Sequence, residues 1–242
     1  MNVLILAAGT LPTDSQEGYP VWLGEVGGSL VLERQVRQLT FGINTHFIFA
    51  FRQQDIEIYH LNDIVQQIAP GDAVVNIKRP TKGAACTALL TINAVDLENE
   101  LVIVSATDQI DADCAAAVES FRARGADAGV MTFESLHPRY SYVRLGGDGW
   151  VQEVAEKRPI SRTANAGFYW FKRAADFFVC AQEMILKDEQ VQDRFFIAPT
   201  LNEMILTQKK IATYVLEQNQ YHPLKAPNQV EAFELSLERK GR

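Results

Sequence analysis

The chain has 242 residues, of which 47% are hydrophobic and 22% are charged, and no tract of biased composition interrupts it. This length suits a single domain with a sizeable core, and the composition excludes a disordered or fibrous protein. The formal net charge of -7 argues against nucleic acid or a membrane surface as a partner, because those surfaces attract clustered lysine and arginine.

The cysteines and the N-terminal run bear on the compartment. Cys86, Cys114 and Cys180 are an odd number at wide spacing, so they match neither a disulfide framework nor a zinc site. We therefore expect a reducing compartment and a cytoplasmic protein. The apolar run Val3–Ala8 has no basic residue before it and is too short to span a bilayer, which predicts a buried strand.

Strands and helices alternate through residues 1–135. Strands are predicted over Val3–Leu6, Thr45–Phe51, Val74–Ile77, Leu101–Ser105 and Ala128–Phe133. Helices are predicted over Leu30–Leu39, Asp55–Ile68, Ala84–Ala94 and Cys114–Arg124. This order predicts a three-layer α/β fold around a doubly wound, mostly parallel sheet, which binds ligands beyond the carboxyl ends of its strands.

The pattern becomes richer in strands over residues 136–242. Strands are predicted over Tyr140–Leu145, Val151–Ala155 and Phe168–Lys172, and helices over Ala174–Leu186 and Thr200–Thr207. No linker-like stretch separates the two halves. We therefore expect one domain over 1–242, with the β-rich half acting as a lid on the first half.

Two small-residue loops follow predicted strands of the first half. Leu6-Ala7-Ala8-Gly9 lets the backbone approach a ligand closely, although a tight turn alone would also require small residues. Thr81–Thr87, with Lys82 and Gly83, leads into a helix whose free N–H groups favour negative charge. The alternative for this second loop is an ordinary helix start with solvated lysines.

Two charged groups complete the candidate site. Asp108 follows an apolar strand, where its carboxylate could share Mg²⁺ with substrate phosphates or simply cap a turn. Glu156 and Lys157 follow a later strand, where the acid could accept hydroxyl hydrogens and the lysine could pair with a phosphate. A solvated charge cluster is the alternative, and Asn165 and Gly167 lie shortly afterwards.

These four groups, in this order and at these separations, resemble the sugar nucleotidyltransferase family, which has a GT-A-like fold, over nearly the whole chain. The resemblance implies a nucleotide-binding half over 1–135 and a sugar-phosphate-binding half over 136–242. The nucleotide-binding residues that it implies are Leu6, Ala7, Ala8, Gly9, Lys82 and Gly83. The sugar-phosphate-binding residues that it implies are Glu156, Lys157, Asn165 and Gly167. Lys157 and Asp108 would be catalytic, and Asp108 would hold Mg²⁺, with Asn202 as a candidate second ligand.

The chain departs from the family pattern in its signature loop. The family has an arginine and a lysine for the phosphates where this chain reads Gly9-Thr10-Leu11-Pro12 and then Tyr19-Pro20-Val21-Trp22. The late Gly-Thr-Pro segment becomes Lys225-Ala226-Pro227. One electrostatic donor is often worth ~3 kcal/mol of transition-state stabilisation. Either catalysis is impaired or other cations substitute, for which the candidates are Arg52, Lys78, Arg79 and Lys82.

The first hypothesis is therefore an enzyme that uses an NTP, a phosphorylated sugar or sugar-like acceptor and Mg²⁺ to form an NDP-sugar and pyrophosphate, for polysaccharide or glycoconjugate biosynthesis. The second is a paralogue that binds nucleotide or sugar nucleotide without turnover and acts as a regulatory subunit. A third is a glycosyltransferase that holds metal through Asp111-Ala112-Asp113. A homo-oligomer is left open.

Overall fold

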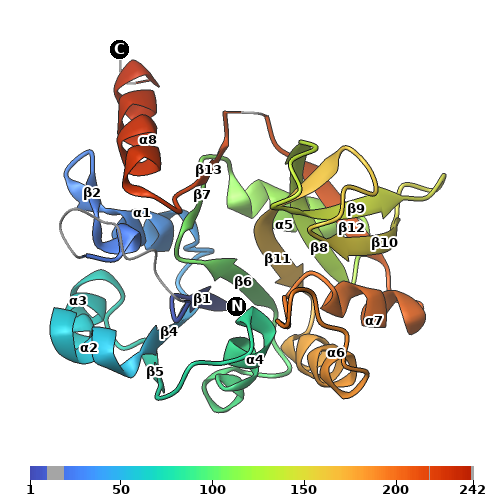
Figure 1. Ribbon diagram of the computed structural model, residues 1–242, viewed down its shortest axis with the longest axis horizontal. Coiled ribbons are helices and arrows are strands. Elements are labelled where there is room, and N and C mark those ends of the chain that lie inside the picture. The colour runs from blue at the N-terminus through green and yellow to red at the C-terminus, as the bar shows by residue number, and fades with distance from the viewer. Residues whose placement is uncertain (10–18, 218, 241–242) are drawn as a thin grey trace.

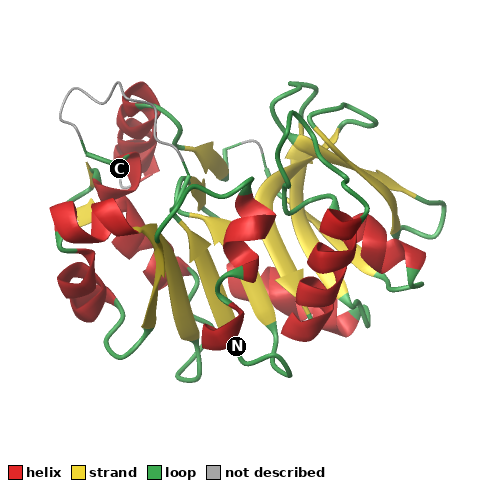
Figure 2. Ribbon diagram, turned by 60° about the horizontal axis from the view of Figure 1, so that its bottom comes forward, coloured by secondary structure: helices red, strands yellow, loops and turns green. Residues whose placement is uncertain are grey.

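The computed structural model describes residues 1–9, 19–217 and 219–240. Its main feature is a nine-stranded sheet that runs through both halves of the chain, with helices on its two faces (Figures 1 and 2). The sheet strands are β1 (Asn2–Leu6), β4 (His46–Arg52), β5 (Ala73–Ile77), β6 (Leu101–Ser105), β8 (Ala128–Glu134), β9 (Ser141–Leu145), β10 (Val151–Glu156), β11 (Thr163–Phe171) and β12 (Ile211–Val215). The three-layer α/β fold that the sequence predicts is confirmed.

Helices and short ribbons surround this sheet. The helices are α1 (Val31–Gln38), α2 (Gln53–Tyr59), α3 (Leu61–Ile68), α4 (Ala84–Leu89), α5 (Cys114–Ala123), α6 (Ala174–Leu186), α7 (Thr200–Leu206) and α8 (Pro227–Lys240), with 3₁₀ turns η1 (Val21–Leu23) and η2 (Ile92–Ala94). Two ribbons of two strands lie outside the sheet: β2 (Glu25–Val26) with β3 (Ser29–Leu30), and β7 (Asp108–Ile110) with β13 (Tyr221–Pro223). Within the described ranges, no helix is long and apolar enough to cross a membrane.

The sheet is parallel in its first half and mixed in its second half. Strands β5, β4, β1 and β6 are parallel neighbours, so their carboxyl ends meet at one edge. Strand β11 then pairs antiparallel with β6, and β8 lies beyond it. The fifth predicted strand therefore does not extend the parallel sheet directly, because the later strand β11 lies between it and β6. Strand β11 is also longer than predicted and bulges between Asn165 and Tyr169.

Alternating side chains of the central strands form a core on each face of the sheet. Val3 and Ile5 of β1 pack with α1, α3 and α5, whereas Leu4 between them packs with α4, α6 and α7. All three side chains are fully buried. This alternation is what a strand covered on both faces requires.

Several predicted element boundaries differ from the structure for local reasons. The helix predicted over Asp55–Ile68 is two helices, because His60 has the left-handed φ of 51° and interrupts it. The helix predicted over Ala84–Ala94 ends at Leu89 and is followed by a 3₁₀ turn. Strands β7, β12 and β13 and helix α8 are not predicted by the sequence patterns.

Candidate active site

A cleft of about 620 Å³ opens where β1 and β6 end, and β10, β11 and the loop before α4 complete its walls. The predicted site residues that line it are Leu6, Ala8, Gly9, Gly83, Asp108, Glu156, Lys157, Asn165 and Gly167. These residues come from both halves of the chain. The continuous sheet therefore brings the four sequence groups together around one cavity.

Three other predicted site residues do not line this cleft. Ala7 is buried in the sheet layer, and its N–H donates to the Ala50 carbonyl at 3.0 Å. The Lys82 carbonyl accepts from the Phe195 N–H at 2.7 Å, and its side chain is not part of the described lining. Asn202 needs a correction, because its amide donates to and accepts from the Val154 backbone, each at 2.9 Å. That amide joins α7 to β10 and is not a ligand beside Asp108.

Gly83 has a structural reason to be glycine. Its φ is 129°, and a Cβ atom there would lie 2.3 Å from the Phe195 carbonyl oxygen. The Ala85 N–H donates to this same carbonyl at 3.1 Å, so the segment after α6 packs directly on the start of α4. The absence of a side chain lets these two segments form one wall of the cleft.

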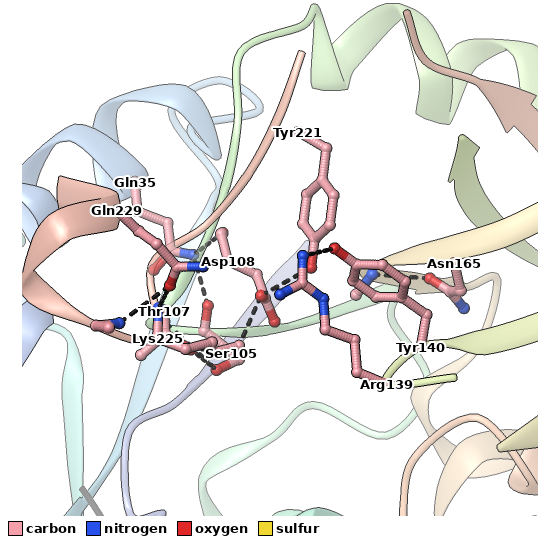
Figure 3. Close-up of polar contacts among 12 residues, drawn as sticks. Gln35, Ser105, Thr107, Asp108, Arg139, Tyr140, Asn165, Tyr221, Lys225 and Gln229 are labelled. Carbon is pink, nitrogen blue, oxygen red and sulfur yellow. Dashed lines mark hydrogen bonds and ion pairs between the residues drawn. The ribbon is translucent and has the colours of Figure 1, made fainter. Parts of the chain in front are cut away.

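Asp108 lies in the cleft and is 9% exposed, at the start of β7. Its Oδ1 accepts from the Tyr221 hydroxyl at 3.0 Å and pairs with the Lys225 Nζ at 2.8 Å (Figure 3). Its Oδ2 faces Gly167, where a Cβ atom would lie only 2.9 Å away. Burial and then the Asp108 charge raise the pKa of the Tyr221 phenol well above its ordinary value, which keeps this hydroxyl a donor.

The donors around Asp108 do not fit the expected Mg²⁺ ion. Within the described ranges, no three histidine, cysteine, aspartate or glutamate side chains come close enough together to hold a metal. A carboxylate that shares Mg²⁺ with phosphates must turn an open oxygen toward them. Here a lysine ammonium pairs with Oδ1, which also accepts from the Tyr221 hydroxyl, so the position that a cation beside this oxygen would take is already occupied.

Glu156 and Lys157 lie together at the end of β10. Burial raises the pKa of the Glu156 carboxyl to about 7, and the neighbouring Lys157 charge lowers it only in part. Lys157 has the left-handed φ of 55°, and its Nζ donates to Gln192 Oε1 at 2.6 Å. The same ammonium lies 4.8 Å from the centre of the Phe196 ring. These contacts hold the lysine in the cleft wall, and neither of them is with a carboxylate.

Asn165 presents a buried amide to the cleft. The side chain is 3% exposed, and its Oδ1 accepts from the Gly167 N–H at 2.8 Å (Figure 3). Its Nδ2 has no partner among the described residues. A buried donor without a partner costs free energy, so such an amide suits a ligand that brings an acceptor.

The described residues that line the cleft carry a net positive formal charge, although the chain as a whole has a net charge of -7. The charged residues among them are the basic Arg139, Lys157, Arg194 and Lys225 and the acidic Asp108 and Glu156, which gives a formal charge of +2. Such a cavity suits an anionic ligand. Arg139 lies against the Tyr140 ring, 4.7 Å from its centre, and donates to its hydroxyl (Figure 3).

Sequence patterns alone missed three of these cations. Arg139, Arg194 and Lys225 line the cleft, whereas the proposed substitutes Lys78, Arg79 and Lys82 are not part of its described lining. The fourth substitute, Arg52, is paired with Asp55 by two hydrogen bonds, at 2.7 and 2.8 Å. Only Lys225 had a signal in the sequence, because it replaces the glycine of the late Gly-Thr-Pro segment.

Within the acidic pair Asp111 and Asp113, the second aspartate has a structural role. Asp113 is the N-cap of α5, and its Oδ1 accepts from the Ala116 N–H at 2.9 Å. Neither aspartate is part of the described lining of the cleft. The residues 10–12, where the sequence departs from the family's signature loop, lie outside the described residues.

A mixed sheet whose parallel strands end at a cleft lined by several cations is an arrangement that suits ligands with phosphate groups. The model of the nucleotidyl transferase family matches residues 31–220, which is more than half of the chain. The chain belongs to this family. The matched range begins after the Leu6–Gly9 loop and after the segment in which the sequence departs from the family pattern. A search of curated protein sequences finds no match.

Solved structures show the same fold over nearly the whole chain. A nucleoside-diphosphate-sugar pyrophosphorylase from Vibrio cholerae RC9 has a TM-score of 0.79 at 20% identity and covers 97% of this chain and 100% of its own. UDP-glucose pyrophosphorylase complexed with UDP-glucose has a TM-score of 0.77 at 13% identity, covering 99% and 98%. The inositol-1-phosphate CTP transferase from T. maritima has a TM-score of 0.74 at 12% identity, covering 99% and 96%.

Proposed function

We propose that this chain transfers a nucleotidyl group from an NTP to a phosphorylated sugar or sugar-like acceptor, forming an NDP-sugar and pyrophosphate for polysaccharide or glycoconjugate biosynthesis. An acceptor phosphate oxygen forms the new bond to the α-phosphorus, and the bond from that phosphorus to the pyrophosphate oxygen breaks. The attacking oxygen is already anionic, so no general base is needed. The leaving pyrophosphate takes the electron pair of the broken bond.

The observation that carries this proposal is the cationic cleft between the two halves of a nucleotidyl transferase fold. Lining residues from β1 and the loop before α4 face lining residues from β10 and β11, and the lining charges sum to +2. A transfer between two phosphates needs room for both substrates and cations near the phosphorus oxygens. The structural relatives named above act on different nucleotides, so we leave the base open.

We assign the roles within the cleft by chemistry. Leu6, Ala8, Gly9 and Gly83 form the small-residue wall that suits a nucleotide, and Lys157 suits the acceptor phosphate. The Nδ2 of Asn165, which has no partner among the described residues, suits a hydroxyl oxygen or phosphate oxygen of the acceptor. The Glu156 carboxyl accepts a hydrogen bond from a sugar hydroxyl when it is ionised and can donate one when it is protonated. Because all three cysteines are free thiols, we keep the cytoplasm as the proposed compartment.

A panel assay of pyrophosphate release tests this function. The purified chain is supplied with each of ATP, CTP, GTP, UTP and dTTP against a broad set of sugar phosphates and related phosphate esters, once with Mg²⁺ and once with EDTA. We expect release with one nucleotide and a narrow group of acceptors. Lys157→Met should raise the KM for the acceptor at least tenfold, since a charge-assisted contact is lost.

The adjacent arginine is the matched control. Arg158 is 70% exposed, pairs with Glu153 at 3.0 Å and is not part of the described lining. Arg158→Met should therefore behave as wild type. Nucleotide binding without pyrophosphate release, across the whole panel, would instead support a regulatory paralogue, which the lost signature cations favour. Absence of both binding and release would contradict either function.

A further inference from the structure

Backbone contacts of Lys225 and of the residues just before it position the Lys225 side chain in the cleft. In the β7–β13 ribbon, Pro223 is the partner of Asp108, and the Leu224 N–H donates to the Thr107 carbonyl at 2.7 Å. The Lys225 N–H donates to Gln229 Oε1 of α8 at 2.6 Å. The backbone position from which this lysine reaches the cleft is therefore determined by two elements.

The ammonium group of Lys225 occupies the position that a cation bound to the Asp108 carboxylate would take. Its Nζ lies 2.8 Å from Asp108 Oδ1 and 2.5 Å from Thr107 Oγ1 (Figure 3). An ammonium has three N–H donors, and these two contacts use two of them. The side chain is half exposed and lines the cleft, so its third donor remains for a ligand there.

The surroundings of Asp108 favour this lysine over a divalent ion. Tyr221 shares Oδ1 with the lysine, so this oxygen already accepts from two donors. Asn202, which could have supplied a second oxygen, is bonded to the Val154 backbone. An ammonium needs only hydrogen-bond acceptors, whereas Mg²⁺ needs a near-octahedral shell of oxygens.

We propose that the ammonium group of Lys225 takes the place of a divalent cation at Asp108, so that the cleft binds the phosphates of its ligand without a metal. The proposal rests on the proposed function in one respect only, namely that the ligand carries phosphates. One ammonium brings less charge than a divalent ion. Arg139, Arg194 and Lys157 line the same cleft and supply the remaining positive charge.

Isothermal titration calorimetry on the full chain tests this inference. The probes are inorganic pyrophosphate and each of the five NTPs, titrated first in EDTA and then in Mg²⁺. We expect the wild type to bind at least one probe in EDTA, with a Kd that Mg²⁺ changes by less than about threefold. Lys225→Met should weaken this binding by about tenfold or more in EDTA, because a charge-assisted hydrogen bond is lost. Lys225→Arg should retain binding in EDTA.

A second lysine–carboxylate pair supplies the matched control. Lys187 pairs with Glu203 at 2.6 Å and is 44% exposed, close to the 50% of Lys225, but it is not part of the described lining. Lys187→Met should bind the probes as the wild type does. Melting temperatures of all variants show whether a loss of binding comes from unfolding.

The outcomes separate this inference from the proposed function. Wild-type binding at least tenfold tighter in Mg²⁺ than in EDTA overturns the inference, and so does a Lys225→Met variant that binds in EDTA as wild type does. No binding of any probe in EDTA overturns it as well. Pyrophosphate release together with probe binding that is lost in EDTA leaves the function intact and overturns the inference. Tight binding in EDTA without pyrophosphate release supports the inference and contradicts the function.

Discussion

The buried carboxyl of Glu156 makes a measurable prediction about stability and pH. Its pKa is raised from 4.5 to about 7 because burial disfavours the charged form. In the unfolded chain this carboxyl returns to its ordinary pKa. Between these two pKa values the folded protein binds the proton more tightly than the unfolded chain does, so the contribution of this group to stability falls as pH rises.

The magnitude follows from the two pKa values. A tenfold difference in proton affinity is worth about 1.4 kcal/mol, so a pKa that rises from 4.5 to about 7 amounts to about 3 kcal/mol. This penalty is absent below pH 4.5, grows between the two values and is complete above pH 7. Glu156→Gln removes the titration and keeps the shape of the side chain. The variant should therefore gain up to about 3 kcal/mol over the wild type between acidic and weakly alkaline pH.

Urea unfolding at pH 5 and pH 8 measures this difference. The free energy of unfolding of Glu156→Gln minus that of the wild type should be larger at pH 8. Glu153 on the same strand is the control, because its carboxylate pairs with Arg144 and Arg158. Glu153→Gln should show no gain as pH rises. A Glu156→Gln difference that is equal at the two pH values would refute the idea that burial raises this pKa.

Three further substitutions test single contacts. Gly83→Ala should lower stability by about 3 kcal/mol or more, seen as a lower Tm in calorimetry, because its φ is 129° and the new Cβ would meet the Phe195 carbonyl at 2.3 Å. An unchanged Tm would show that this backbone moves aside. Asn165→Asp should raise the KM for the acceptor about tenfold, since an acceptor oxygen replaces the unpartnered Nδ2 donor; an unchanged KM would show that the amide does not face the acceptor. Asp113→Ala should lower the free energy of urea unfolding by about 1 kcal/mol through loss of its bond to the Ala116 N–H, without affecting turnover. Loss of turnover at normal stability would favour a metal role for Asp113.

The alternating strands and helices could be predicted from the sequence because each type of element has a characteristic pattern of hydrophobic residues. Leu101–Ser105 and Ala174–Leu186 have the predicted bounds, since a buried strand and a helix with one apolar face both leave a local signature. The insertion of β11 between β6 and β8 could not be predicted, because pairing partners are chosen by the whole sheet. The three-residue strands β7 and β13 are too short to show a period.

Some residues of the candidate site could likewise be predicted from the sequence, and others could not. Gly9, Gly83 and Asp108 follow strands or precede a helix, so their place at one edge of the sheet follows from topology. Arg139 and Arg194 lie in loops, where neither periodicity nor spacing indicates which way a side chain points. The amide of Asn202 matched a motif position, but its bonds to Val154 depend on how α7 packs against β10.

The ribbon of β7 and β13 affects how the protein folds during its synthesis. The contact between Thr107 and Lys225 joins residues 118 positions apart. Contacts of such high sequence separation form slowly, because a long loop must close before they are made. A nascent chain that has not yet exposed residues 221–225 outside the ribosome can pair β1, β4, β5 and β6, yet it has no cation beside Asp108. The binding competence of the cleft should therefore arise late, after most of the sheet is already in place.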